Sequence, residues 1–384
     1  MKVAVLGYGT VGAGVYSMLS DAPGMEAGPV LVRPGKAVES FMVSDAALIF
    51  GDPTVDAVVE TLGGLDPAYS YGMRALEAGK HFITANKAMV AAHGLELAAL
   101  AREKGAAFLF SAACGGGVPF LHNLALSAET DRIEAVSGIL NGTTNFMFDA
   151  MQRRGLSYGD ALREAQSLGY AESDPTADVS GLDALRKMQL ACAVAFGVLP
   201  QSGMLCEGME HFTAADVEDI QSRGLVCRLM ARGSRAGESV SAYVEPVLFP
   251  RAAPESSVFT NNNMARYTGK RCGSIVLMGQ GAGRFPTASA VLRDLSAAQQ
   301  GARSMFPENC RAAEADNREA VHSYYIRTGG FAAVRLPLRS VLAQGEVVRA
   351  VTEPMSAEKM HALAQNIRKD GNDLFFAALE EELC

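Results

Sequence analysis

The feature that most constrains the fold is a glycine-rich turn near the N-terminus. A short apolar run, residues 3–6, leads into the sequence GYGTVG at residues 7–12 and then into a helical pattern through Leu19. In a strand–turn–helix unit, the first glycines permit a tight turn close to a pyrophosphate, and the last lets the helix pack on the sheet. The segment predicts a dinucleotide site, the alternative being a glycine turn that holds no ligand.

Strands and helices alternate along the first third of the chain. We expect strands at residues 30–32, 57–59, 81–84 and 107–110, and helices at 67–78 and 88–103. This alternation predicts an α/β fold with a Rossmann-type, doubly wound parallel sheet. The stretch 36–50 is short for a helix, a strand and a helix, so we expect a shortened second half.

The pattern changes after Pro119 to a mixture that is typical of an α+β domain. Expected strands cover residues 133–140, 240–246 and 274–278, and expected helices cover 141–153, 157–168 and 182–198. We predict a nucleotide-binding domain at 1–130, a substrate and dimerisation domain at 131–278, a glycine turn and helix returning to the first domain at 279–302, and a C-terminal module at 320–384.

Composition excludes several classes of protein. The 384 residues carry a formal net charge of −8, which argues against a nucleic-acid or anionic-membrane surface. The sequence has no apolar run of about 18 residues and no signal-peptide pattern at its start. Its seven scattered cysteines are typical of reduced thiols, so we expect a cytoplasmic protein.

An acidic segment at residues 169–187 is the strongest catalytic candidate. It places Glu172, Asp174, Asp178 and Asp183 ahead of Lys187. Asp183 and Lys187 are four residues apart, so they share a face of the predicted helix. A carboxylate and an ammonium there can hold a small zwitterion and deliver a proton. The alternative is an ordinary surface ion pair.

Six separated motifs together resemble the homoserine dehydrogenase family. They are GYGTVG (7–12), VVETLGG (58–64), TANK (84–87), GILNGTTN (138–145), the acidic segment (169–187) and GQGAGRFPTASAV (279–291). The resemblance implies NAD(P)-dependent interconversion of aspartate 4-semialdehyde and homoserine, in threonine and methionine biosynthesis. It also implies a homodimer.

The resemblance assigns roles residue by residue. It makes Lys187 the proton donor and Asp183 its partner, and it places Lys87 beside both the nicotinamide and the substrate. Implied substrate contacts are Gly142, Thr143, Tyr170, Glu172, Asp178 and Asp183. Implied cofactor contacts are Gly7, Gly9, Thr10, Val11, Gly12, Thr61, Gly63, Asn86, Lys87, Gly169 and Gly283. For Lys87 a surface lysine after a strand is the alternative, although the carboxyl end of a parallel strand favours a ligand contact.

The loop after the second strand predicts NADP(H) in preference to NAD(H). An NAD site normally has an acidic residue there to bind the ribose hydroxyls. Here Arg33 and Lys36 follow the strand, and no carboxylate occurs before Glu39. Two cations suit a 2′-phosphate; the alternative is a pair of solvated loop charges.

Two departures from the family pattern matter. The resemblance implies a sodium-like ion held by a glutamate and by backbone carbonyls, here those of Cys114, Gly116 and Val118, but Ser111 stands where the glutamate is expected. We therefore predict a weak or absent ion site. The C-terminal tail opens with a typical YYIR but lacks the Asp-x-Pro-Gly turn of an ACT module, so we expect a reduced ACT-like module.

The sequence leaves two alternative functions open. One is a related dehydrogenase of another amino-acid-derived carbonyl, against which the full acidic segment argues. The other is a regulatory protein that binds NADP without turnover, as the shortened nucleotide half and the missing glutamate suggest. The presence of Lys87, Asp183 and Lys187 argues against that.

Overall fold

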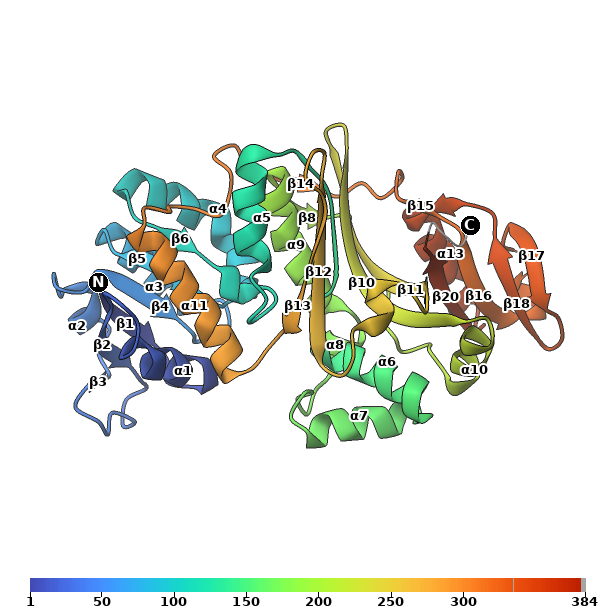
Figure 1. Ribbon diagram of the computed structural model, residues 1–384, viewed down its shortest axis with the longest axis horizontal. Coiled ribbons are helices and arrows are strands. Elements are labelled where there is room, and N and C mark those ends of the chain that lie inside the picture. Colours follow the sequence, from blue (N-terminus) through green and yellow to red (C-terminus); the bar gives the residue numbers. More distant parts are fainter. Residues whose placement is uncertain (334, 381–384) are drawn as a thin grey trace.

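The computed structural model describes residues 1–333 and 335–380 of an elongated molecule, with the N-terminal domain at one end and the C-terminal module at the other (Figure 1). The N-terminal sheet has the order β3-β2-β1-β4-β5-β6, and all its neighbouring strands are parallel. Its strands are β1 (Lys2–Leu6), β2 (Glu26–Leu31), β3 (Met42–Val43), β4 (Ala57–Glu60), β5 (His81–Thr84) and β6 (Phe108–Leu109). This order is that of a Rossmann fold, which confirms the predicted fold class.

The shortening of this fold lies between β2 and β3. No helix occurs in residues 32–41, and β3 has only two residues before the short helix α2 (Ala47–Phe50). The strand β2 begins at Glu26, four residues before the predicted start. The early part of β2 lies so close to β1 that a Cβ at Gly28 would be 2.9 Å from the carbonyl oxygen of Val3, so glycine suits this position although it is uncommon in strands.

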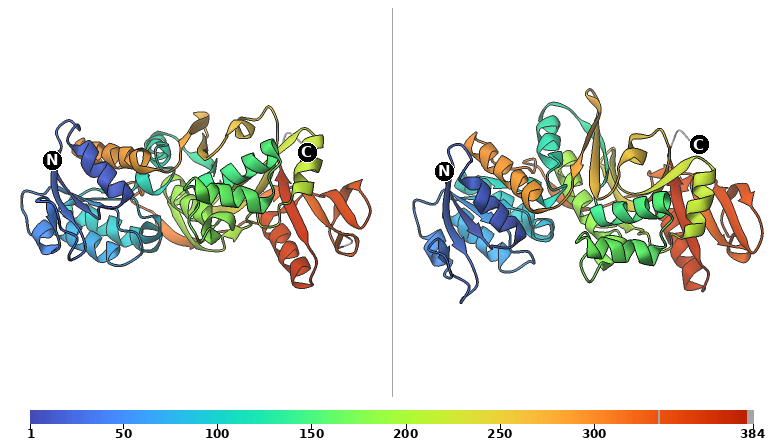
Figure 2. Two further views of the ribbon diagram at one scale, coloured as in Figure 1. Left: turned by 90° about the horizontal axis from the view of Figure 1, so that it is seen from below. Right: turned by 60° about the horizontal axis from the view of Figure 1, so that its bottom comes forward.

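Helices α1 (Thr10–Leu19), α3 (Ala68–Glu77) and α4 (Lys87–Lys104) connect these strands. A later helix, α11 (Arg284–Gln299), lies beside α1, as Figures 1 and 2 show. The two helices approach so closely that a Cβ at Gly14 would lie 2.9 Å from Arg284 and 3.2 Å from Ala288. The chain therefore returns to the N-terminal sheet after crossing the middle of the molecule.

A ten-stranded sheet forms the rest of the molecule. Its first five strands run in the order β13 (Gly273–Gln280), β12 (Asn262–Gly269), β7 (Ile133–Ile139), β10 (Leu225–Ala236) and β11 (Ser239–Pro250), with β13 at the edge and β9 (Leu205–Cys206) paired to β11. The helices of this region are α5 (Phe120–Thr130), α6 (Gly142–Arg154), α7 (Tyr158–Ser167), α8 (Thr176–Val179), α9 (Leu182–Phe196) and α10 (Ala214–Ser222). Short parallel strands β8 (Val198–Ser202) and β14 (Arg311–Glu314) pair separately.

The C-terminal module extends the same sheet, because β20 (Leu374–Leu379) pairs in parallel with β11. Its elements follow the order β16 (Tyr324–Gly329), α12 (Gly330–Ala333), β17 (Leu338–Ala343), β18 (Val347–Thr352), α13 (Ala357–Lys369) and β20, beside a small pair β15 (Val321–His322) and β19 (Met355–Ser356). The spatial order β20-β16-β18-β17 with antiparallel neighbours is the ferredoxin-like βαββαβ arrangement. Its first helix has only four residues, in keeping with a reduced module.

Candidate active site

The predicted catalytic residues meet at one buried carboxylate. Asp183, 9% exposed, has one oxygen 2.7 Å from the Lys187 Nζ and the other 3.1 Å from the Lys87 Nζ. Lys187 also donates to the Leu140 carbonyl at 2.6 Å. An ammonium has three N–H bonds, so one remains for a substrate oxygen.

Local structure explains how the two lysines reach this point. Asp183 and Lys187 lie one turn apart on α9, whose start is set by Gly181 at φ +83°, a conformation that favours glycine. Lys87 is the first residue of α4, three residues after the end of β5, and the Asn86 side chain caps that helix by accepting from the Met89 N–H at 3.1 Å. Lys87 therefore lies at the carboxyl end of a parallel strand.

Asn141 is a site residue that the sequence analysis did not assign. Its Nδ2 donates to Asp178 at 2.7 Å and to Asp183 at 2.9 Å, while its Oδ1 caps α6 through the Thr144 N–H. Thr143 donates to the Tyr170 carbonyl at 2.6 Å and lies 3.3 Å from Asp178. The first turn of α6, with its free N–H groups, is thereby fixed beside both carboxylates.

The surroundings set the charges of these groups. Burial alone would raise the pKa of Asp183, but Lys187 and Lys87 outweigh it and hold that pKa well below its usual range. Burial likewise opposes the charge of Lys187, yet Asp183 raises the pKa of Lys187. Burial raises the pKa of Asp178, against the opposing hydrogen bond from Asn141. Lys187 is therefore a charged donor with its proton held in place.

A cavity of about 1080 Å³ adjoins the glycine turn. Six of the predicted cofactor residues line it: Gly7, Gly9, Arg33, Lys36, Thr61 and Gly63. Gly12 does not line it but keeps the turn tight, since a Cβ there would clash with the Gly7 carbonyl. The size and the close approach fit a dinucleotide.

Glu60, at the end of β4, supports the floor of this cavity and was also not assigned from sequence. It is fully buried, accepts from the Leu62 and Gly63 N–H groups at 2.6 and 3.2 Å, and accepts from Thr84 at 2.5 Å. Asn86 donates to the Gly64 carbonyl at 2.6 Å. These contacts join the cofactor loop to the start of α4 and hence to Lys87.

Other predicted residues neither line the cofactor cavity nor donate a side-chain hydrogen bond to Asp178 or Asp183. Thr10 and Val11 belong to the first turn of α1, and the exposed Gly169 lies in the turn after α7. Gly283 precedes α11, at φ +118°. Tyr170 is 37% exposed and packs its ring on Phe146, and Glu172 is exposed on the loop before α8. Only the Tyr170 carbonyl touches the cluster.

The loop predicted to hold an ion has contacts unlike those of a cation site. Both the amide and the hydroxyl of Ser111 donate to Asp294 of α11. The Val118 carbonyl accepts from the Phe120 N–H at 2.7 Å, and the Arg293 guanidinium donates to the Gly117 carbonyl at 3.3 Å. A guanidinium on this loop opposes a second cation, and no cluster of three metal-binding side chains occurs among the described residues. These residues do not fit a bound ion; its absence stays a prediction.

Comparison with known proteins decides the family. Residues 7–111 match the model of the homoserine dehydrogenase NAD-binding domain, and residues 119–296 match that of homoserine dehydrogenase. The homoserine dehydrogenase of Corynebacterium glutamicum is 38% identical over 76% of this chain and 70% of that protein. The chain belongs to the homoserine dehydrogenase family. The enzyme is therefore an NAD(P)-dependent oxidoreductase that acts on a small molecule, and the predicted resemblance is confirmed.

Two further relatives agree. The homoserine dehydrogenase of Synechocystis sp. is 37% identical over 77% of this chain and 72% of that protein. The solved structure of a homoserine dehydrogenase from Thiobacillus denitrificans superposes with a TM-score of 0.87 at 29% identity, covering 99% of this chain and 98% of that one. In the described part of the enzyme, every helix is too short or too polar to traverse a bilayer.

Proposed function

We propose that the enzyme reduces L-aspartate 4-semialdehyde to L-homoserine with NADPH, in threonine and methionine biosynthesis, and that Lys187 is the general acid. The observation that carries this proposal is the Lys187 ammonium, on a side chain only 12% exposed, held by Asp183 and the Leu140 carbonyl with one N–H left over. A nicotinamide supplies a hydride when bound in the cavity beside the glycine turn.

Protonation follows from the position of the ammonium. A carbonyl that receives a hydride develops negative charge on its oxygen, and a positioned ammonium stabilises that charge and gives up a proton. Asp183 keeps the ammonium in place, and Lys87 adds a second positive charge on the opposite oxygen of the same carboxylate. Both lysines thus favour an oxygen that becomes negative.

The substrate's own charges find complements nearby. Its ammonium suits Asp178 and also Glu172 on the exposed loop before α8. The N–H groups of Gly142 and Thr143 at the start of α6 suit its carboxylate. Asn141 and Thr143 hold Asp178 in place for this contact.

Arg33 and Lys36 support the choice of NADPH, because both line the cofactor cavity two to five residues after β2. Following NADPH absorbance with aspartate semialdehyde tests the reaction, and comparing kcat/KM for NADPH and NADH tests the preference. Arg33→Ser should lower kcat/KM for NADPH about tenfold, the value of one charge-assisted contact, and leave NADH nearly unchanged. Arg102→Ser, an exposed arginine outside the cavity, is the control. A preference for NADH would reject this cofactor.

We further propose a homodimer in the cytoplasm. The strand β13 lies at the edge of the ten-stranded sheet and exposes Val276 and Met278 by 41% and 59%, an apolar surface that a second copy can cover. The six cysteines of the described residues are all free thiols, which suits a reducing compartment. Light scattering of the purified enzyme tests the dimer, and cell fractionation tests the compartment.

A further inference from the structure

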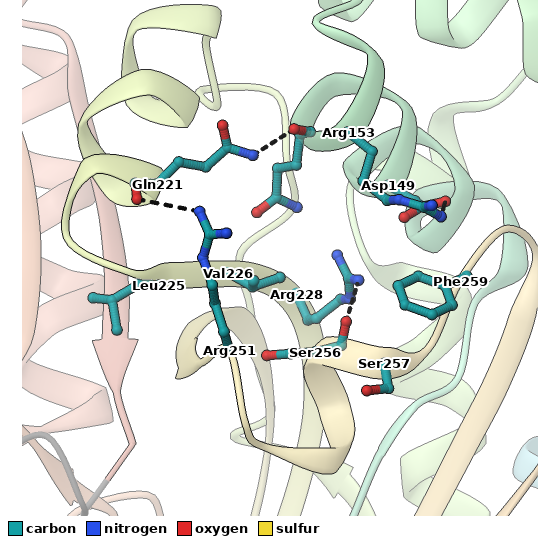
Figure 3. Close-up of a pocket in the computed structure, with 11 residues that line it drawn as sticks. Asp149, Arg153, Gln221, Leu225, Val226, Arg228, Arg251, Ser256, Ser257 and Phe259 are labelled. Carbon is teal, nitrogen blue, oxygen red and sulfur yellow. Dashed lines mark hydrogen bonds and ion pairs between the residues drawn. The ribbon is translucent and has the colours of Figure 1, made fainter.

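A second charged pocket lies outside the active site. It opens between α6, α10, β10 and the 3₁₀ helix η2 (Pro254–Ser257), has a volume of about 290 Å³, and is shown in Figure 3. Three arginines, Arg153, Arg228 and Arg251, line it with a single carboxylate, Asp149. In a chain with a net charge of −8, such a concentration of positive charge needs a reason.

Arg228 is the central residue of this pocket. It is 2% exposed, and its guanidinium donates only to the backbone carbonyls of Cys227, Glu255 and Ser256, at 3.2 to 3.3 Å. The Glu255 carboxylate pairs instead with Arg266 at 2.7 Å. No carboxylate of residues 1–333 or 335–380 forms an ion pair with Arg228, and burial lowers its pKa.

Asp149 attracts Arg228 without a direct ion pair, so the cost of burying this cation is only partly compensated, and a ligand anion on its guanidinium would offset the rest. Figure 3 shows Arg228 between Arg251 and Phe259, with Asp149 and Arg153 above the ring in this view, where the Arg153 guanidinium lies over it at 4.6 Å. Arg251 donates to the Gln221 carbonyl at 3.5 Å, so it too has no acidic partner in the described chain. The pocket therefore favours an oxyanion.

Asp149 narrows the choice of ligand. One of its oxygens accepts from the Thr260 N–H at 3.1 Å and lies 3.7 Å from Arg153, while its other oxygen is buried without a hydrogen-bond partner. A carboxylate in this state repels a phosphate dianion but attracts an ammonium. Leu225, Val226 and Phe259 add apolar surface to the lining, which suits an organic ligand.

We propose that this pocket binds a small α-amino acid, with its carboxylate at Arg228 and its ammonium at Asp149. Helix α6 connects the pocket to the active site, since Asp149 and Arg153 lie on the same helix as Gly142 and Thr143. Helix α10 connects it to the C-terminal module, because Asp216 and Asp219 hold Arg327 and Tyr325 of β16 at 2.7 and 2.9 Å. An occupant is thus placed to act on both.

Thermal unfolding of the full enzyme tests this proposal. The probes are the common L-amino acids, inorganic phosphate, and succinate as an anion without an ammonium, each at about 5 mM. At ten times its Kd, the bound amino acid should raise the melting temperature by about 2 °C. With NADPH saturating the cofactor cavity in every sample, phosphate and succinate should give no comparable shift. A shift with either of these anions, or none with any amino acid, would overturn the proposal.

Variants separate this pocket from the substrate site. Ser257→Trp fills the pocket mouth from an exposed position and should weaken binding at least about tenfold, as should Asp149→Asn. Ser222→Trp, an exposed neighbour outside the lining, and Glu172→Gln, at the rim of the proposed substrate site, should keep the shift. A shift that survives Ser257→Trp, or that Glu172→Gln removes, would place the ligand elsewhere and reject the pocket. If Asp149→Asn does not fold, Ser257→Trp decides.

Discussion

Asp183 and Asp294 are two buried carboxylates whose helices contact the same segment, residues 111–118. The Cys114 thiol lies 3.8 Å from the Lys187 carbonyl of α9, and Ser111 bonds to Asp294 of α11. Asp183 has two lysines at contact distance, whereas Asp294 has a serine hydroxyl and an amide. Burial acts to raise the pKa of both carboxyl groups, yet the pKa of Asp183 falls well below its usual range and that of Asp294 rises to about 7.

The difference shows that direct neighbours, more than burial, decide the charge of a carboxylate in this enzyme. Asp183 is 9% exposed and Asp294 is 1% exposed, so burial opposes the charge of both. Two ammonium groups overcome that opposition at Asp183, while hydrogen bonds from Ser111 do not at Asp294. The first carboxylate can therefore organise proton transfer, and the second anchors α11 to the loop.

The largest expected effect comes from removing Lys187, one of the two lysines that pair with Asp183. Lys187→Ala should lower kcat by roughly 100-fold or more, because it deletes the positioned proton donor. NADPH binding, measured by fluorescence, should stay near wild type. Arg186→Ala, the exposed neighbour on α9, is the matched control. Near-normal turnover of Lys187→Ala would reject its role as the general acid.

A neutral residue at position 183 would remove the difference in charge between this position and a protonated Asp294. Asp183→Asn removes the charge that holds Lys187 and Lys87, and we expect kcat to fall by tens of fold, with a lower pKa for the Lys187 ammonium. On the basic side of the pH profile, kcat should then begin to fall at a lower pH than in the wild type. A profile identical to that of the wild type would show that Asp183 does not set the charge of Lys187.

At Asp294 the expected effect is on stability and depends on pH. Because the folded-state pKa of about 7 lies above the unfolded value of 3.8, the native state binds the proton more tightly. This contribution to stability is complete below about pH 4 and is lost as the pH rises through 7. Asp294→Asn, which mimics the protonated form, should therefore lose less stability than the wild type between these pH values.

The difference between Asp294→Asn and the wild type at pH 8 should be of the order of a few kcal/mol in unfolding free energy. Urea unfolding at pH 5 and pH 8 measures it, with Asp21→Asn, on an exposed carboxylate, as the control. Parallel curves for wild type and variant across this range would mean that Asp294 is already ionised.

The sequence predicts the contact within one helix at Asp183 but not the contacts between elements that are far apart in the chain. Asp183 and Lys187 could be paired because a helix places residues four apart on one face. Asn141, which bridges Asp178 and Asp183, depends on α6 meeting α9, and Asp294 reaches Ser111 only because α11 returns to the first domain. The return of α11 is expected from the glycine turn and helix at 279–302, but no local pattern shows which side chains meet there.

The same limit applies to the fold. The predicted strand at residues 30–32 starts four residues later than β2, since Gly28 and Pro29 interrupt an apolar pattern that parallel pairing with β1 nevertheless accommodates. The sequence predicts no strand at β10 or β12, because arginine, serine and asparagine residues in these segments hide the alternation of a sheet. The alternating pattern of the first third needs no such long-range knowledge and gives the correct fold class.

The smallest expected effect concerns added salt. The negative charge of Asp183 is balanced by two lysines. The segment beside Asp294 already has a positive group in Arg293, which donates to the Gly117 carbonyl. A monovalent cation needs oxygen ligands and a nearby negative charge, and in an assay at pH 6, below the pKa of about 7, the protonated Asp294 supplies none. Sodium or potassium at about 100 mM should therefore change kcat/KM by less than about twofold relative to choline chloride at equal ionic strength. Melting temperature measured in the same three salts gives a readout that does not depend on turnover. A saturable activation, or a melting temperature raised by sodium alone, would show that carbonyls of this loop bind an ion without the glutamate, and Asp294 would then have to be charged like Asp183.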